Sequence, residues 1–320
     1  MEDLLYSEIN IFSIIILLII AFEAMLLGCD KNSKNKLFIA SVWCAIISNA
    51  LDFIWNLGKS NILSIPVWMM WLINFLYFLA FGCLAFFWCL YAEATHGNNI
   101  YKDKLRTVLC SIPLMVLAVI LVCSFKTGWI FYFDEDNVYH RGQLFYMQYF
   151  LSYGYIIVTS IRTLVTALSE SNYAYRRNFL TISAFAVSPI ISGLIQVEFR
   201  YIPVLTIGIV VSFLLVYISS LQALISIDPL TGINNRRKML VDLTAKTKSI
   251  EKNEKLYFIF IDIDSFKYIN DSYGHNEGDR ILKIVSSAIN EICKNVNGFC
   301  ARYGGDEFAM ALVLKKDEDI

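Results

Sequence analysis

The sequence predicts an all-α bundle of seven membrane-spanning helices over residues 1–224, followed by an α+β domain over residues 225–320. Charge is the first indication, because residues 1–225 carry 13 basic and 13 acidic residues, whereas the 95 residues from 226 onward carry 14 and 15. The whole chain is 57% hydrophobic and 17% charged, against about 25% charged residues in soluble domains. This composition excludes a single soluble domain. A net charge of −1 also gives no global field that would attract nucleic acid.

Seven apolar segments are long enough to cross a membrane, since about 20 apolar residues in a helix span the ~30 Å hydrocarbon core. They are Ile9–Gly28, Leu37–Leu57, Pro66–Leu90, Thr107–Phe125, Phe145–Leu168, Phe179–Val197 and Ile202–Leu224. The stretch before the first segment is acidic and no small-residue cleavage site follows it. The first segment is therefore predicted to be a membrane span and not a cleaved signal peptide.

Lysine and arginine predict the orientation of these spans, because basic residues are more frequent in cytoplasmic loops. Eight of them fall on one side of the membrane: Lys31, Lys34, Lys36, Lys102, Lys104, Arg106, Arg176 and Arg177. Four fall on the other side: Lys59, Lys126, Arg141 and Arg200. We therefore expect a multi-pass protein of the lipid bilayer with its N-terminus outside and residues from 225 onward in the cytoplasm.

Ionisable residues within the spans are few. Glu23, Asp52 and Arg162 are the three, and such residues usually face a bundle interior or a cavity. The spans lack the dense polar pathway of a transporter, so packing or signal relay is the favoured role for Asp52. The longest external loop, 126–143, combines aromatic and acidic residues. It fits an interfacial aromatic belt with an acidic turn, or a surface that senses an unknown input ligand.

The soluble part predicts alternating helices and strands. Asp228–Gly232 is a turn that ends the last span. The elements that follow are a helix capped by Asn234 and running to about Ser249, a buried strand at Lys255–Asp264, a helix at Gly278–Ile292, and strands at Phe299–Tyr303 and Phe308–Leu314. The last two strands flank a tight turn whose two glycines suit positive φ in a hairpin.

Carboxylates cluster where these predicted strands end. Asp262 and Asp264 close the first strand, and Asp306 and Glu307 lie in the hairpin turn. If the strands are neighbours, four carboxylates converge at one end of the sheet. Mg²⁺ prefers such oxygen ligands and shares them with substrate phosphates. Strand-end carboxylates are also commonly just solvated, so this spacing alone indicates a candidate metal–nucleotide site.

Other polar residues nearby suit a nucleotide. Gly304 and Gly305 would let the backbone approach a ligand without an intervening side chain. The ammonium of Lys267, just beyond the first strand, could neutralise phosphate charge. Asn270 and Asp279 form a polar pair suited to a purine edge, because a carboxylate accepts hydrogen bonds from the N1–H and N2–H₂ groups of guanine.

The motifs of residues 228–320 occur in the same order as those of a known protein family. The chain contains Asp228-Pro-Leu-Thr-Gly, Asn235-Arg-Arg, Asp262-Ile-Asp-Ser-Phe-Lys-Tyr-Ile-Asn-Asp, Gly274-His, Gly278-Asp and Ala301-Arg-Tyr-Gly-Gly-Asp-Glu-Phe in succession. Residues 228–320 thereby resemble the GGDEF family of bacterial diguanylate cyclases. The resemblance implies a fold similar to the palm of adenylyl cyclases and polymerases. It also implies a nucleotidyltransferase that condenses two GTP into cyclic di-GMP with release of two pyrophosphates, at a bacterial inner membrane.

The resemblance also implies roles for individual residues. Two Mg²⁺ per active site would be bound by Asp262, the Ile263 carbonyl, Asp306 and Glu307. Catalytic roles fall to Asp306 as proton acceptor, to Glu307 beside the metals and to Lys267 on the phosphates. Substrate would be bound by Phe266 through its backbone, Asn270, Asp279, Gly304 and Gly305. Each subunit holds one GTP, so a homodimer is needed, and the short connector Ala223–Ile227 would transmit helix movement into it.

The sequence departs from the family pattern in two places, which affect the expected product feedback and the expected activity. Asn295 and Gly298 replace the arginine and aspartate of the family's product-inhibition motif, so product feedback at that place is not expected. The chain also ends at Ile320, before the family's last strands and a Lys/Arg-bearing helix. We therefore expect an incomplete sheet with Phe308–Leu314 as a free edge, and weak or no activity from these 320 residues alone.

Alternative functions remain open from the sequence. One is a non-catalytic seven-span receptor whose GGDEF-type domain binds GTP or docks a partner. The intact Asp262, Lys267, Asp306 and Glu307 argue against it, and the early end of the chain argues for it. Another is a transporter or channel with an accessory domain, which the low polar content of the spans disfavours.

Overall fold

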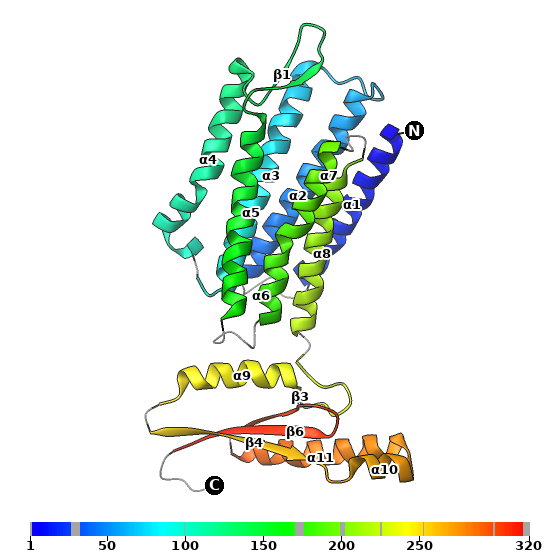
Figure 1. The fold of residues 1–320 in the computed structure, drawn as a ribbon, viewed down its shortest axis with the longest axis vertical. Helices are drawn as coiled ribbons and strands as arrows, with labels where there is room; N and C mark the ends of the chain where they lie inside the picture. The colour runs from blue at the N-terminus through cyan, green and yellow to red at the C-terminus, as the bar shows by residue number, and fades with distance from the viewer. Residues whose placement is uncertain are drawn as a thin grey trace. The chain divides into compact units, whose positions relative to one another are not determined.

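The computed structural model describes residues 2–26, 33–98, 100–169, 176–198, 202–224, 226–251, 253–296 and 298–315. Two compact units are present, and the chain passes from the first to the second between Ser220 and Leu221. The first is the helical unit and the second is the sheet-containing unit (Figure 1).

Within the described residues, seven helices of the helical unit are long and apolar enough to cross a membrane, in agreement with the seven predicted apolar segments. They are α1 (Glu2–Leu26), α2 (Ser33–Lys59), α3 (Val67–Thr95), α4 (Lys104–Thr127), α5 (Phe145–Leu168), a sixth made of α6 (Arg176–Ser183), η3 (Ala184–Ala186) and α7 (Val187–Glu198), and α8 (Val204–Leu224). A short 3₁₀ turn, η1 (Ile100–Lys102), precedes α4.

Aromatic rings fill the centre of this bundle. Trp88 of α3 is fully buried and stacks on Phe185 with ring centroids 3.6 Å apart. Phe213 of α8 meets Phe185 edge-on at 5.1 Å. These contacts join α3, the sixth span and α8, as expected for helices whose polar backbone groups are satisfied internally and whose packing depends on shape.

The segment between α4 and α5 is a β-hairpin, formed by β1 (Phe131–Phe133) and β2 (Tyr139–Arg141). Its turn is held by Asp134, whose carboxylate accepts from the backbone N–H groups of Asp136 and Val138 and lies 2.7 Å from His140 Nε2. The Ser124 hydroxyl at the end of α4 accepts from the Ile130 N–H at 2.9 Å and thereby fixes the base of the hairpin.

The sheet-containing unit has a four-stranded sheet in the order β3-β5-β6-β4. Its strands are β3 (Asn234–Asn235), β4 (Glu254–Asp262), β5 (Phe299–Arg302) and β6 (Glu307–Lys315), and only the β3–β5 pair is parallel. Helix α9 (Arg236–Ser249) covers one face, while α10 (Phe266–Tyr273) and α11 (His275–Asn295) cover the other (Figure 1).

Each face of the sheet has its own apolar core. Met239 of α9 is fully buried against the small side chains of Ala301 and Ala309. On the opposite face Phe308 is fully buried with Leu282 and other apolar residues of α11. The alternation of side chains along β6 therefore decides which helix each residue meets.

The predicted free edge at Phe308–Leu314 and the predicted burial of the strand at Lys255–Asp264 are both wrong. Phe308–Leu314 is not a free edge, because β6 pairs with β5 on one side and with β4 on the other. Strand β4 instead lies at the end of the sheet order, and it is only partly buried, with Phe258 40% and Phe260 55% exposed. The aromatic composition of β4 predicts a strand correctly, but it says nothing about how many neighbours cover it.

The N-cap of α9 is shifted by one residue from its predicted place. Asn235 has the extended backbone of a cap, and its side-chain oxygen accepts from the Lys238 N–H at 3.0 Å. Asn234 belongs to β3, and its side-chain amide donates to the Cys300 carbonyl at 3.0 Å. Both residue types suit a cap, so only the strand pairing separates them.

Candidate functional site

Acidic residues meet at one end of the β4–β6 pair. Asp262 is the direct cross-strand partner of Glu307, and paired residues of an antiparallel ladder point to the same face. Asp306 immediately precedes β6 in the hairpin turn, and Asp264 follows β4 by two residues. The predicted neighbourhood of the two strands is therefore correct, and it places Asp262 beside the turn.

The four predicted carboxylates, Asp262, Asp264, Asp306 and Glu307, do not form one cluster that could coordinate a metal ion. Within the described ranges no group of three or more His, Cys, Asp or Glu side chains is placed to hold a metal ion. Asp262, Asp306 and Glu307 also form no ion pair or side-chain hydrogen bond with any described residue, so their oxygens are open to a cation. This donor set fits Mg²⁺, which takes one or two carboxylates and completes its shell with water and substrate phosphates.

The hairpin turn between β5 and β6 is closed by its backbone. The N–H groups of Tyr303 and Gly304 donate to the Glu307 carbonyl at 2.8 and 3.2 Å. Neither glycine of the turn takes a positive φ, contrary to the prediction. A Cβ on Gly304 would come within 2.6 Å of a Glu307 carboxylate oxygen, whereas one on Gly305 would meet nothing within 4 Å. A side chain at Gly304 would therefore displace only the flexible end of the exposed Glu307 side chain.

Arg302 braces this turn, although it was not among the predicted site residues. Its Nε and Nη2 donate to the Gly305 carbonyl at 2.9 and 2.7 Å, and its Nη1 donates to Asp228 at 3.2 Å. Both charged side chains are 17% exposed. Arg302 therefore ties the acidic turn to the turn that opens the domain.

Asp228 is held as a carboxylate by its neighbours. Partial burial acts to raise its pKa, but the hydrogen bonds from the Thr231 hydroxyl and N–H and from Arg302 outweigh it and hold the pKa below its usual range. Gly232, at φ +73°, lets the chain reverse so that its N–H donates to the Asp228 carbonyl at 2.9 Å. The two motifs that contain Asp228 and Arg302 are thereby joined in one structure.

The corner between β4 and α10 carries the other predicted phosphate contacts. Ser265 has φ +56°, an uncommon conformation for a residue with a side chain, and it turns the chain into α10 at Phe266. The Ile263 carbonyl, a predicted metal ligand, already accepts from the Phe266 N–H at 3.3 Å and keeps one lone pair free. Lys267 is exposed and has no ion-pair partner among the described residues.

The predicted guanine-binding residues lie at the junction of α10 and α11. Gly278 of α11 is buried against Asn270 of α10, and a Cβ there would clash with the Asn270 side-chain oxygen. Asp279 is the next residue and is exposed. Gly274, at φ +85°, makes the sharp bend that brings the two helices together. Asn270 and Asp279 are thus brought to the same corner, although α10 itself was not predicted as a helix.

Residues 225–320 match the family model described as diguanylate cyclase, GGDEF domain, so this part of the chain is a GGDEF domain. The match agrees with the fold and the motifs described above. It covers the sheet-containing unit and none of the seven membrane-length helices.

Several bacterial proteins are similar to this region. Diguanylate cyclase DgcP of Escherichia coli K12 is 39% identical over 94 residues, which are 29% of this chain and 27% of DgcP. Probable diguanylate cyclase DgcF of E. coli K12 is 37% identical over 108 residues, 32% of this chain and 33% of DgcF. Cyclic di-GMP phosphodiesterase NbdA of Pseudomonas aeruginosa is 36% identical over 102 residues, 32% of this chain and 13% of NbdA.

The chain thus spans about a third or less of the length of these relatives. Among solved structures, diguanylate cyclase SiaD in complex with its activator SiaC from P. aeruginosa aligns with 62% of this chain and 62% of its own. Its TM-score is 0.26 at 21% sequence identity.

Proposed function

We propose that this protein is a membrane-bound diguanylate cyclase that condenses two GTP into cyclic di-GMP and two pyrophosphates. The observation that carries the proposal is the β4–β6 pairing, which sets Asp262 opposite Glu307 with Asp306 in the adjoining turn, within a GGDEF domain. These carboxylates have no other partner among the described residues, which supports a role in binding metal ions and a nucleotide.

The proposed roles of the site residues are those that the GGDEF resemblance implies. Two Mg²⁺ bound by Asp262, the Ile263 carbonyl, Asp306 and Glu307 would neutralise phosphate charge and acidify the attacking 3′-hydroxyl. Asp306 accepts the proton of that hydroxyl. Lys267 faces the phosphates and stabilises the charge that develops in the transition state.

Guanine specificity comes from the α10–α11 corner. Asp279 accepts from the N1–H and N2–H₂ groups of the base, and Asn270 holds its other polar edge. The backbone around Phe266 and the glycine turn approach the phosphates, because neither Gly304 nor Gly305 has a side chain in the way.

Dimerisation is part of the proposed mechanism. Each domain presents one GTP, and two domains facing each other supply the in-line geometry that a single domain lacks. The seven-span unit is proposed to control this encounter in response to an input ligand, with the GGDEF domain in the cytoplasm.

The test is formation of cyclic di-GMP from GTP and Mg²⁺ by the purified protein in nanodiscs. We expect product from the wild type when it is extended to its natural reading frame, and weak or no product from residues 1–320 alone. Asp306→Ala should lower the rate of the extended form by at least about 10²-fold, since electrostatic and proton-transfer contributions of this kind are that large. Asp242→Ala is the matched control, because Asp242 pairs with Lys238 on α9 and lies outside the site. An extended, dimeric, GTP-binding preparation that makes no product would refute the proposal.

A further inference from the structure

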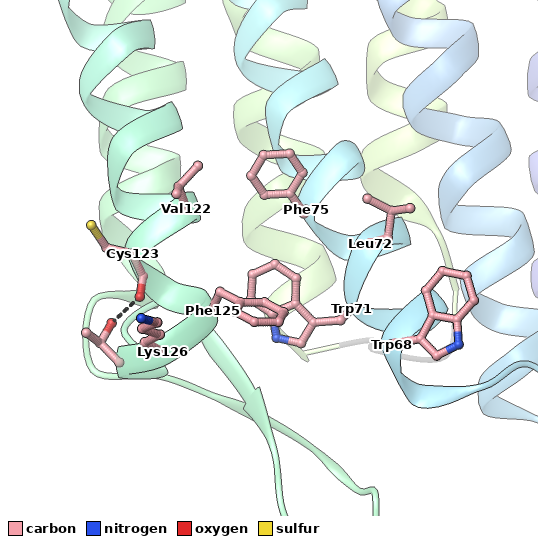
Figure 2. Close-up of a pocket in the computed structure, with 9 residues that line it drawn as sticks. Trp68, Trp71, Leu72, Phe75, Val122, Cys123, Phe125 and Lys126 are labelled. Carbon is pink, nitrogen blue, oxygen red and sulfur yellow. Dashed lines mark hydrogen bonds between the residues drawn. The ribbon is translucent and has the colours of Figure 1, made fainter.

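A cavity of about 780 Å³ lies between α3 and α4, in the helical unit (Figure 2). We call it the α3–α4 trough; it is lined by Trp68, Trp71, Leu72, Phe75, Val122, Cys123, Phe125, Lys126 and Thr127. Its volume lies within the ~300–1,000 Å³ of typical ligand pockets. The lining comes from the first turns of α3 and the last turns of α4, so the trough lies at the end of the bundle that carries the β1–β2 hairpin.

The walls of the trough are apolar. Trp71 meets Phe125 edge-on at 4.8 Å, and on the inner side it contacts the buried Phe131 of the hairpin at 4.7 Å. Trp68, Val122 and Phe125 are 66%, 62% and 67% exposed, so the trough opens sideways onto the surface that a membrane-spanning helix shows to lipid. An apolar chain entering from the bilayer would find aromatic and aliphatic contacts on both sides.

One positive charge stands at the end of the trough. Lys126, in the last turn of α4, is the only charged residue of the lining, and no acidic group of the described residues forms an ion pair with it. The neighbouring Thr127 hydroxyl is occupied, because it donates to the Cys123 carbonyl at 2.9 Å (Figure 2). The ammonium of Lys126 is therefore the group that an anionic head would meet.

We infer that the α3–α4 trough binds one acyl chain of an anionic phospholipid, whose phosphate lies against Lys126. A phospholipid is favoured because the trough opens sideways to the bilayer, where its second chain remains. Tryptophans near a helix end mark the level of the headgroups, which places a phosphate beside the last turn of α4. A zwitterionic lipid carries its own cation, and that cation offsets the attraction of Lys126.

Occupancy of the trough would hold α4 in place. Within α4 the buried residues are Leu117, Leu121 and Ser124, so most of this helix has little protein around it. An acyl chain between Trp71 and Val122 replaces contacts that the protein itself does not supply. Lipid composition thereby becomes an input to the helical unit that does not depend on the proposed cyclase activity.

The test compares brominated lipids as quenchers of tryptophan fluorescence in nanodiscs. Phosphatidylglycerol and phosphatidylcholine with the same brominated chain are supplied at equal mole fraction in separate preparations. We expect the anionic lipid to bind the trough roughly fivefold better, the factor that one lysine near an anionic surface is worth. Native mass spectrometry provides a second measurement, the number of lipid molecules that each protein retains.

Two variants locate the effect. Lys126→Gln is expected to abolish the preference for phosphatidylglycerol, and Val122→Phe is expected to reduce quenching by both lipids because it fills the trough. Lys59→Gln, a matched change of an exposed lysine outside the lining, is expected to keep the full preference.

Three results would overturn the inference. The first is equal quenching by both lipids in the wild type, which would leave Lys126 an ordinary interfacial lysine. The second is loss of the preference in Lys59→Gln to the same degree as in Lys126→Gln, which would indicate general surface potential. The third is displacement of the phospholipid by an equal amount of free stearate, which would assign the trough to a fatty acid.

Discussion

Single side chains decide how the α10–α11 corner, the proposed guanine site, is built. Gly278 has no side chain, and the space this leaves is taken by Asn270 from the preceding helix. Asp279 follows directly, so the position of Asn270 relative to Asp279 depends on one missing methyl group. A substitution there acts on the proposed base contacts without removing either of them.

Gly278→Ala is expected to weaken GTP binding about as much as Asn270→Ala does, because the added methyl displaces the Asn270 side chain. Each loss corresponds to a hydrogen bond of about 1 kcal/mol, or roughly fivefold in Kd. Binding of a fluorescent GTP analogue to the nanodisc-embedded protein measures it. Gly154→Ala is the control, since a Cβ there meets nothing within 4 Å. Unchanged affinity in Gly278→Ala would contradict the packing argument.

Asp228 makes the sheet-containing unit sensitive to acid. Its pKa is lowered in the folded state because the Thr231 and Arg302 hydrogen bonds outweigh the effect of burial. Ionised Asp228 therefore stabilises the fold fully above its unfolded pKa of about 3.9, and this contribution is lost as pH falls through the lower folded value.

Asp228→Asn is expected to lower the opening free energy of the β5 and β6 amides by about 1–3 kcal/mol at neutral pH, since a charged hydrogen-bond acceptor is lost. The gap between wild type and variant should close as the pH falls below about 4. Native-state hydrogen exchange measures both. A gap that stays constant with pH would show that Asp228 acts through its shape and not its charge.

Helices and strands were predictable where composition alone determines them. The seven spans follow from runs of apolar residues, and β5 and β6 follow from short apolar segments on either side of two glycines. Helix α10 was not predicted because it has only eight residues and starts after Ser265, whose positive φ has no sequence signal. The edge position of β4 depends on pairing partners elsewhere in the chain.

In the candidate site, too, only the features that depend on local sequence were predictable. Carboxylates at strand ends could be located from the sequence, but the brace from Arg302 to Asp228 joins residues 74 positions apart. A local pattern cannot reveal such a contact.

In the helical unit, Glu93 was missed for a related reason. Helix α3 continues past the predicted end of its span to Thr95, and this extension carries the partner of Arg162.

The Glu93–Arg162 pair connects α3 and α5 at 2.8 Å. The Glu93 side chain is only 5% exposed, whereas that of Arg162 is 53% exposed. Arg162→Ala is expected to destabilise the helical unit by about 1–3 kcal/mol, less than the ~3–5 kcal/mol of a fully buried pair, because it leaves a buried charge. Thermal unfolding in detergent measures this.

A double-mutant cycle tests the cause. Glu93→Gln combined with Arg162→Ala should be more stable than Arg162→Ala alone, since the buried charge is gone. Arg106→Ala, which removes an exposed pair with Asp103, should cost no more than about 0.5 kcal/mol. Additive losses in the cycle would mean that Arg162 contributes through packing only.

The chain as a whole is expected to cross the membrane seven times with its GGDEF domain in the cytoplasm, as the distribution of basic residues predicts. Asp136→Cys, in the β1–β2 turn, should react with a membrane-impermeant maleimide in intact bacteria. Asp271→Cys, exposed on α10, should react only after lysis. The reverse pattern would invert the topology and place the proposed cyclase away from cytoplasmic GTP.

The 3₁₀ segment inside the sixth span changes the angular phase of that helix. Three residues advance by a full turn in a 3₁₀ helix but by only about 300° in an α-helix, so the side chains of α7 are rotated by about 60° from where an uninterrupted helix would place them. Ile182 before the 3₁₀ segment and Phe185 within it are both buried. The Phe185 carbonyl accepts from the Ser212 hydroxyl of α8 at 2.8 Å, which anchors the break. A helical wheel drawn with a single period over residues 176–198 would therefore misplace the side chains of α7 by about 60°.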